Sequence, residues 1–237
     1  MSAMPLELST PWTGRSTPLV RSRPTVLGLL VASWAALCGV VLGVGWLLTN
    51  PLSGSVGQGD DDLARWLAGN RTPMLNDVAE VGSLFGDTIT GQVALVAVAL
   101  GFSVWQRSVI PALFVGLVEA GLLGIYLVTT HLVPRSRPPV EILDPGLVPD
   151  HSFPSGHVAT ATAIYGSIVV LTWTYSRAAR RWTMPLLVLP PCVMLARIYL
   201  GAHHLSDVVA SILYATTWLG LVTTLLLGGR STRRDET

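Results

Sequence analysis

VLGLLVASWAALCGVVLGVGWLLT, at residues 26–49, contains no charged residue and is long enough to cross a membrane as one helix. A bilayer core needs about 20 mostly apolar residues per helix. Arg15, Arg21 and Arg23 precede this stretch, as basic residues do in a signal peptide. The apolar run is too long for a typical signal peptide, however, and no clear cleavage site follows it. We therefore interpret residues 26–49 as a retained membrane span.

Five more apolar stretches follow, at residues 88–106, 108–130, 158–176, 182–202 and 208–229. The stretch that starts at residue 182 is the weakest, because it is rich in proline and reaches spanning length only if residues 197–202 extend it. Only 12% of all residues are charged, whereas about a quarter are charged in a soluble domain. The sequence therefore predicts an all-α fold, a polytopic membrane helical bundle with six transmembrane helices.

The arginines give this predicted bundle an orientation. With the N-terminus inside the cell, most arginines fall on the inner side, as the positive-inside rule requires. The tails at residues 1–25 and 230–237 are then cytoplasmic, and residues 26–229 form one six-span domain. All five histidines fall at the outer face. A formal net charge of +1 gives no support for nucleic-acid binding.

A short helix outside the membrane is predicted after the first span. In residues 50–87, a Gly/Ser-rich turn precedes Asp60, Asp61 and Asp62, and apolar residues spaced as on one helix face come next. Acidic residues are favoured at a helix start, and an apolar face lets a helix lie on the membrane. We favour a capped surface helix without a catalytic part.

Three polar segments fall at the predicted outer ends of the third, fourth and fifth spans: RSRP at 135–138, SFPSGH at 152–157 and RIYLGAHHLSD at 197–207. On a helix, His203 and Asp207 share a face, so the carboxylate would accept the ring Nδ1–H and leave Nε2 as a nucleophile. N–H groups at a helix start near Gly156 attract anions, and arginines offer forked donors for phosphate oxygens. A histidine that attacks, a second that protonates the leaving oxygen and arginines that hold the charge form a phosphoryl-transfer site.

These segments resemble the signature of the type 2 phosphatidic acid phosphatase superfamily, which also includes bacterial acid phosphatases and vanadium haloperoxidases. The signature reads KxxxxxxRP, PSGH and SRxxxxxHxxxD. Its second part is matched at residues 154–157, and its third at Arg197, His203 and Asp207, with Ala196 in place of serine. The six-span layout also resembles the membrane branch of this superfamily.

The resemblance implies a role for each matched residue. His203 would attack phosphorus and form a phosphohistidine, Asp207 would orient it, and His157 would protonate the leaving group and later activate water. The groups implied to bind phosphate oxygens are Arg137, Arg197, Ser155 and the amide of Gly156. The resemblance implies no metal and no other cofactor.

The first part of the signature is matched only at Arg137 and Pro138, because Thr130 stands at the lysine position. The missing cation could weaken binding, change the preferred phosphate, or be replaced by Arg135 or His131. Arg135 is therefore a further candidate for phosphate binding. His151 and His204 are interpreted as bystanders that face a loop or head groups.

Glu119 is unexpected within the third span. Carboxylates inside membrane spans are often functional, but a hydrogen-bonded structural role is an equally good interpretation.

We expect a metal-independent lipid phosphatase of the bacterial plasma membrane, whose site at the outer face takes a lipid monophosphate or diphosphate. Polyprenyl diphosphates and phosphatidate-type lipids are the main candidates for the substrate. Two alternatives remain: a vanadate-dependent haloperoxidase-like enzyme, and a lipid-binding or transport protein without turnover.

Overall fold

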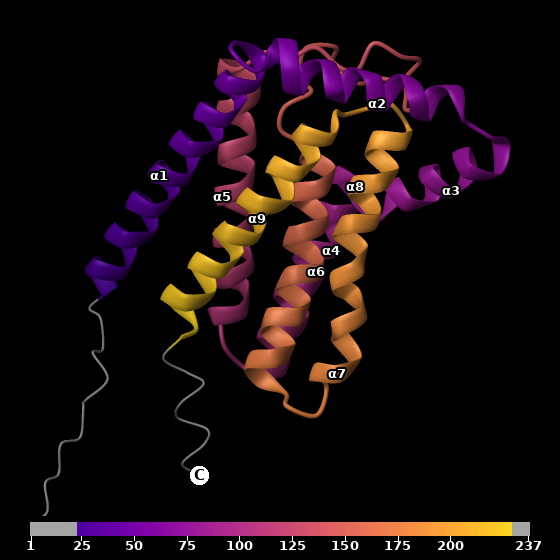
Figure 1. Ribbon diagram of the computed structural model, residues 1–237. Helices are drawn as coiled ribbons and strands as arrows, with labels where there is room; N and C mark the ends of the chain where they lie inside the picture. Colours follow the sequence, from indigo (N-terminus) through magenta and orange to yellow (C-terminus); the bar gives the residue numbers. More distant parts are fainter. Residues whose placement is uncertain (1–22, 229–237) are drawn as a thin grey trace, which may run out of the picture.

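Helices make up most of the part of the chain that the structure describes (Figure 1). The computed structural model describes the backbone of residues 23–228 and the side chains of all of these except Arg23 and Thr88. Nearly all of the two expected tails, residues 1–25 and 230–237, therefore lies outside the described residues. Six helical segments are long and apolar enough to cross a membrane, which confirms the predicted all-α polytopic bundle.

Five of the six spans are continuous helices: α1 (Arg23–Thr49), α4 (Thr88–Gln106), α5 (Ile110–Leu132), α6 (Gly156–Tyr175) and α9 (Leu205–Leu226). Their bounds agree with the predicted apolar runs to within a few residues. Agreement of this kind is expected, because a helix in lipid must satisfy its own backbone hydrogen bonds along its whole length.

The fifth span, Arg180–Tyr199, is built from three pieces. They are α7 (Arg180–Thr183), a 3₁₀ segment η2 (Met184–Val188) and α8 (Leu189–Tyr199). Prolines occupy the first turns of η2 and α8. Because proline has no N–H to donate, it interrupts a helix but is tolerated where a new one starts. The proline-rich stretch therefore spans the membrane as predicted, as an interrupted helix.

Two helices, not one, follow the first span. After the π-helical turn η1 (Ser53–Gly57), α2 (Gln58–Gly69) runs across one end of the bundle, and α3 (Pro73–Leu84) continues from it (Figure 1). The prediction of a single short helix missed α3. Its start carries a recognisable signal, because the hydroxyl of Thr72 accepts a hydrogen bond from the N–H of Leu75 and Pro73 takes the first helical position.

The centre of the bundle is formed by α5, α6 and α9, which pack against one another. Phe114, Val118 and Ile125 of α5 are fully buried there. Gly121 lets α9 approach closely, because a Cβ atom at this position would lie 2.2 Å from Nε1 of Trp218. Small residues permit such approach in membrane bundles, where packing replaces the hydrophobic effect as the main attraction between helices. This packing fixes the ends of α5, α6 and α9 that carry the polar segments.

Candidate active site

The three polar segments meet at the end of the bundle that α2 crosses. Arg137 comes from the loop between α5 and α6, and His157 lies in the first turn of α6, two residues after the N-cap residue Ser155. Arg197 is in the last turn of α8, and His203 is in the turn between α8 and α9. Segments that are far apart in the sequence therefore contribute side chains to one place.

A cavity of about 200 Å³ lies between these segments. The polar residues that line it near the segments are His203, His157, Arg137, Arg197, Gly156 and His151. All of these except His151 were predicted from the sequence to take part in phosphoryl transfer. His151, interpreted as a bystander from the sequence, also lines the cavity.

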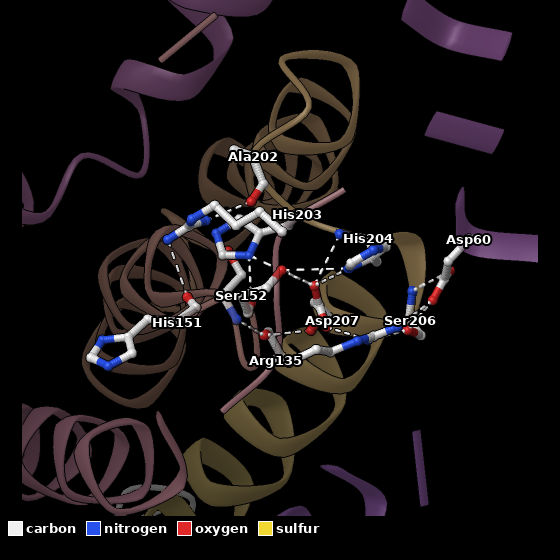
Figure 2. A network of polar contacts seen from close by, with 12 residues as sticks. Asp60, Arg135, His151, Ser152, Ala202, His203, His204, Ser206 and Asp207 are labelled. Atoms are coloured by element: carbon white, nitrogen blue, oxygen red, sulfur yellow. Dashed lines mark hydrogen bonds and ion pairs between the residues drawn. The ribbon is translucent and has the colours of Figure 1, made fainter. Parts of the chain in front are cut away.

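His203 is held by a backbone oxygen. Its Nδ1 lies 2.6 Å from the carbonyl oxygen of Ser152, in a buried environment (Figure 2). Because a carbonyl oxygen can only accept a hydrogen bond, Nδ1 must carry the proton, and Nε2 keeps its lone pair. Burial, helped by the positive charges of Arg197 and Arg137, lowers the pKa of His203 well below its ordinary value. At neutral pH this imidazole is therefore an uncharged base with Nε2 available for attack.

Asp207 does not accept a hydrogen bond from His203, contrary to the expectation from their spacing. The two side chains are 3.9 Å apart, from Nδ1 to Oδ2. The expectation assumed one helix through both residues, but α9 begins only at Leu205 and His204 is its N-cap. The carboxylate instead accepts hydrogen bonds from Ser152 Oγ at 2.6 Å and from the N–H of His204 at 2.9 Å. Asp207 therefore acts on His203 through the Ser152 segment.

Arg197 is fully buried, and part of its guanidinium group has no hydrogen-bond acceptor among the described residues. Its Nη1 donates to Ser83 Oγ at 2.8 Å and to Asp144 Oδ2 at 2.5 Å. Nε and Nη2 have no hydrogen-bond partner among the described residues, and neither has the buried hydroxyl of Ser155. Buried polar groups are nearly always satisfied in folded proteins, so these atoms call for a ligand. An anion with several oxygens, such as phosphate, matches them.

Arg137 is fixed by the backbone around it. Its side chain donates to the carbonyl oxygens of Val148 at 2.8 Å, Ala202 at 2.5 Å and His151 at 3.1 Å. Burial and the charge of Arg197 lower the pKa of Arg137 from its ordinary value. Two arginines beside one cavity repel each other, so a bound anion would relieve this repulsion. Arg137 therefore lines the cavity together with Arg197, with its guanidinium group held by backbone oxygens.

Arg135 faces away from this cavity. It donates to Asp207 through a very short contact, to Ser206 Oγ at 2.7 Å and to Asp60 Oδ2 at 2.9 Å (Figure 2). The structure gives no support to the expectation that Arg135 binds phosphate, because two buried carboxylates take its guanidinium group. Thr130, at the position of the missing lysine, donates to Tyr126 O of its own helix at 3.0 Å. His131, the other proposed replacement, does not line the cavity.

Asp60 and His204 belong to a polar network that the sequence interpretation missed. Asp60, in α2, is buried and accepts from Ser206 N at 3.1 Å as well as from Arg135. His204 is buried too, with Nδ1 3.2 Å from Asp207 Oδ2 and Nε2 3.2 Å from Asp61 Oδ1. The network ties α2 to the start of α9 (Figure 2). Hence Asp60 and Asp61 anchor α2 beside the site and do not merely cap a surface helix.

Residues 111–229 match the PAP2 superfamily. This is half of the chain, and it contains every histidine and arginine that lines the cavity. The chain belongs to the PAP2 superfamily. The match starts in α5 and ends beyond α9, so the signature residues and the helices that carry them fall inside it. With six candidate spans, this PAP2 protein is an integral membrane protein.

Individual relatives support the same assignment. Sphingosine-1-phosphate phosphatase 1 from Rattus norvegicus is 38% identical over 86 residues, which are 33% of this chain and 19% of that protein. The Mus musculus protein of the same name matches equally well. The matched segment therefore spans about a fifth of these curated relatives. A transmembrane PAP2 type phosphatidylglycerolphosphate phosphatase from Bacillus subtilis superposes with a TM-score of 0.64 at 21% identity, covering 88% of this chain and 96% of that one, and it shows the same fold.

No group of three His, Cys, Asp or Glu side chains in residues 23–228 is arranged to hold a metal ion. The donors that lack partners, on Arg197 and Ser155, suit an anion.

Proposed function

We propose that this PAP2 protein hydrolyses a phosphate monoester or diphosphate of a lipid through a phosphohistidine intermediate. One arrangement carries the proposal. His203, with Nδ1 held by a carbonyl and Nε2 free, lines the same cavity as His157 and the arginines Arg137 and Arg197. A neutral nucleophile, a second histidine and two cations around one small cavity are what transfer of a phosphoryl group requires.

The reaction proceeds in two steps. Nε2 of His203 attacks phosphorus, the bond from phosphorus to the ester oxygen breaks, and protonated His157 gives its proton to the departing lipid oxygen. Water then attacks the phosphohistidine and the P–N bond breaks, while His157 takes a proton from that water. The cycle returns both histidines to their starting states. It releases phosphate together with the lipid alcohol from a monoester, or with the lipid monophosphate from a diphosphate. Arg137, Arg197, Ser155 and the amide of Gly156 bind the phosphate oxygens in both steps.

The substrate is a lipid because the site lies at the end of six membrane spans. The names of the relatives point the same way, since one acts on sphingosine-1-phosphate and the other on phosphatidylglycerolphosphate. A head group at this end of the bundle can enter the cavity while its chains stay in the bilayer. Polyprenyl diphosphates and phosphatidate remain candidates beside these two lipids.

We further propose that the site faces the outside of a bacterial plasma membrane and that both chain ends are cytoplasmic. The distribution of arginines supports this orientation. Labelling with a membrane-impermeant thiol reagent tests it. In intact cells, Ser136→Cys in the loop beside the site should react and Ser176→Cys at the opposite end of α6 should not. Labelling in the reverse pattern would refute the orientation.

The activity is tested by phosphate release from purified full-length protein in detergent, with a chelator present. The panel contains a polyprenyl diphosphate, phosphatidate, phosphatidylglycerolphosphate and sphingosine-1-phosphate. We expect release from at least one lipid, inhibition by vanadate and loss of activity in His203→Ala. His131→Ala, which changes an exposed histidine outside the cavity, is the matched control and should stay active.

The intermediate gives a second readout. With a diphosphate substrate, whose leaving group needs less protonation, His157→Ala should accumulate acid-labile phosphate on the protein and His203→Ala should not. Full activity in His203→Ala would rule out the phosphohistidine. Bromide oxidation on addition of vanadate would favour the haloperoxidase alternative. Saturable lipid binding without phosphate release would favour a transport or binding protein.

A further inference from the structure

The turn between α3 and α4 is packed against the start of α6. A Cβ atom on Gly86 would lie 2.6 Å from the carbonyl oxygen of His157, so glycine is required for this approach of the two backbones. One residue earlier, the carbonyl oxygen of Phe85 accepts a hydrogen bond from the hydroxyl of Tyr165 in α6 at 3.1 Å. These two contacts fix the turn on α6 and bring the next residue, Asp87, close to His157.

A second cavity, of about 150 Å³, lies beside this turn. We call it the acidic cavity, because three carboxylates line it: those of Glu80, Asp87 and Asp144. Among the described residues, His157 alone lines both the acidic cavity and the larger cavity that contains the two arginines. The residue proposed to transfer the proton therefore forms part of the wall between the two cavities.

The three carboxylates differ in what they contact. Asp144 accepts a hydrogen bond from Arg197 Nη1 at 2.5 Å, so its charge is already paired. Glu80 is exposed on α3. Asp87 is half-buried and directly follows the glycine that contacts the backbone of His157. Asp87 is therefore the carboxylate that is placed to act on His157 from within the acidic cavity.

Asp87 is ionised for a structural reason. It is the N-cap of α4, and its Oδ1 accepts a hydrogen bond from the N–H of Thr90 at 2.8 Å. This hydrogen bond lowers the pKa of Asp87, and the charge of His157 lowers it further. Asp87 precedes the span that begins at Ile89, so its charge does not lie within the apolar length of a span. At neutral pH the acidic cavity therefore holds a carboxylate beside His157.

The proposed reaction needs a proton on His157 when the lipid oxygen leaves. On the side of the larger cavity, the positive charges of Arg137 and Arg197 disfavour an imidazolium ring. The other ionisable side chains that line this cavity are His203, His151, Tyr126 and Glu119. On the side of the acidic cavity, a negative charge favours the imidazolium ring and offsets the arginines.

We propose that Asp87 is a positioning residue for the proton of His157: its carboxylate, acting from the acidic cavity, keeps the ring protonated until the lipid oxygen leaves. In the second step, the same carboxylate stabilises the imidazolium that forms when His157 takes a proton from the attacking water. Asp87 does not line the larger cavity and acts only through His157. This inference rests on the proposed phosphatase activity and adds to it the residue that controls the charge of the acid.

Two synthetic substrates with the same long alkyl chain test this role: an alkyl phosphate, whose leaving oxygen needs a proton, and a nitrophenyl phosphate, whose leaving oxygen does not. Asp87→Asn removes the charge and keeps the cap, because asparagine caps a helix as well as aspartate does. For the alkyl phosphate, the limb of the kcat/KM profile that falls at high pH should move about one pH unit lower, which is a loss of about tenfold along that limb. For the nitrophenyl phosphate, kcat/KM should change by less than about twofold.

Three further variants separate charge, cap and position. Asp77→Asn changes an exposed carboxylate of α3 that lines neither cavity, and this matched control should leave kcat/KM for both substrates unchanged. Asp87→Ser keeps a cap without a charge, so it should move the high-pH limb as Asp87→Asn does. Asp87→Glu keeps the charge on a poorer capping residue, so it should retain the wild-type limb and lower the melting temperature.

Three results would overturn the role of Asp87. They are an unmoved limb in Asp87→Asn and Asp87→Ser, an equal loss on both substrates in these variants, and the same shift of the limb in Asp87→Glu. If the wild-type protein releases phosphate from neither substrate, the proposed phosphatase activity itself fails. If it hydrolyses the alkyl phosphate with a limb that does not depend on the charge of residue 87, only the role of Asp87 fails.

Discussion

Nδ1 of His203 lies 2.6 Å from the backbone oxygen of Ser152. This hydrogen bond sets the tautomer of the ring that the proposed mechanism uses as nucleophile. The nearest carboxylate, Asp207, is 3.9 Å from the same nitrogen and instead holds the side chain of Ser152 at 2.6 Å. The orientation of His203 therefore depends on a backbone segment that the aspartate keeps in place, and not on direct contact with a charge.

This relationship separates the effects of two substitutions. His203→Ala should abolish activity and leave the melting temperature nearly unchanged. Asp207→Asn should reduce activity only partly, because the carbonyl of Ser152 remains, but it should cost about 3 kcal/mol of stability through the weakened buried pair with Arg135. Phosphate release and thermal unfolding in detergent measure the two effects. Equal activity losses with unchanged stability would indicate direct contact between Asp207 and the ring.

Arg135 and Arg137 are two residues apart and should behave in opposite ways. Arg135→Gln leaves the buried carboxylates of Asp60 and Asp207 without their cation, so we expect a stability loss of about 3–5 kcal/mol. Arg137→Gln removes a cation from the cavity, so its main effect should be a higher KM, with a smaller loss of stability. Thermal unfolding and steady-state kinetics on the two variants check this. A raised KM in a stable Arg135→Gln variant would mean that Arg135 does reach the substrate.

Asp144 orients Arg197 from the side away from the free donors. Its carboxylate binds Nη1, whereas Nε and Nη2 have no partner among the described residues. Asp144→Asn weakens this charge-assisted hydrogen bond, and we expect kcat/KM to fall about tenfold. Glu141→Gln in the same loop is the control and should have no effect. Higher activity in Asp144→Asn would show that the carboxylate competes with phosphate for Arg197.

The close contact between α5 and α9 allows a stability test with an internal control. Gly121→Ala places a methyl group 2.2 Å from Trp218 Nε1, so the helices must move apart at a cost of about 1–3 kcal/mol. Gly116→Ala, in the same helix, meets nothing within 4 Å and should leave stability unchanged or slightly higher. Melting temperatures in detergent compare the two. Equal shifts would contradict the packing described for α5.

The spans and the polar segments at their ends could be predicted from the sequence because both leave local patterns. A membrane helix must be apolar along its length, and phosphate-binding groups cluster at helix ends. The contact between His203 and Asp207 could not be predicted from their spacing. Gly201, at φ 73°, ends α8, and His204 has extended backbone, so the two residues do not share a helix. Glycine after a helical stretch often ends the helix, and the four-residue spacing of His203 and Asp207 does not take this into account.

The buried network around Arg135 could not be predicted from local sequence patterns, for a different reason. Asp60 looked like one member of an acidic helix start, and nothing near it in the sequence indicates an arginine partner in another loop. Only the packing of α2 across the bundle brings the two together. The same holds for Glu119, whose polar partner Gln92 comes from a neighbouring span. Long-range pairs of this kind depend on the tertiary arrangement, which periodicity and spacing do not encode.

The buried imidazole of His203 should also make stability depend on pH. Burial, aided by Arg197 and Arg137, lowers its pKa well below the ordinary value of 6.5. Above pH 6.5 the ring is neutral in both the folded and the unfolded chain, so it adds no pH dependence. Below pH 6.5 the unfolded chain binds a proton that the folded chain does not, so stability falls as the pH drops, by up to about 1.4 kcal/mol per pH unit. Thermal unfolding between pH 7.5 and pH 5 should show a shallower decline in His203→Gln than in the wild type. If His203→Gln declines as steeply as the wild type, the folded protein accommodates a charged His203, and the neutral nucleophile loses its physical basis.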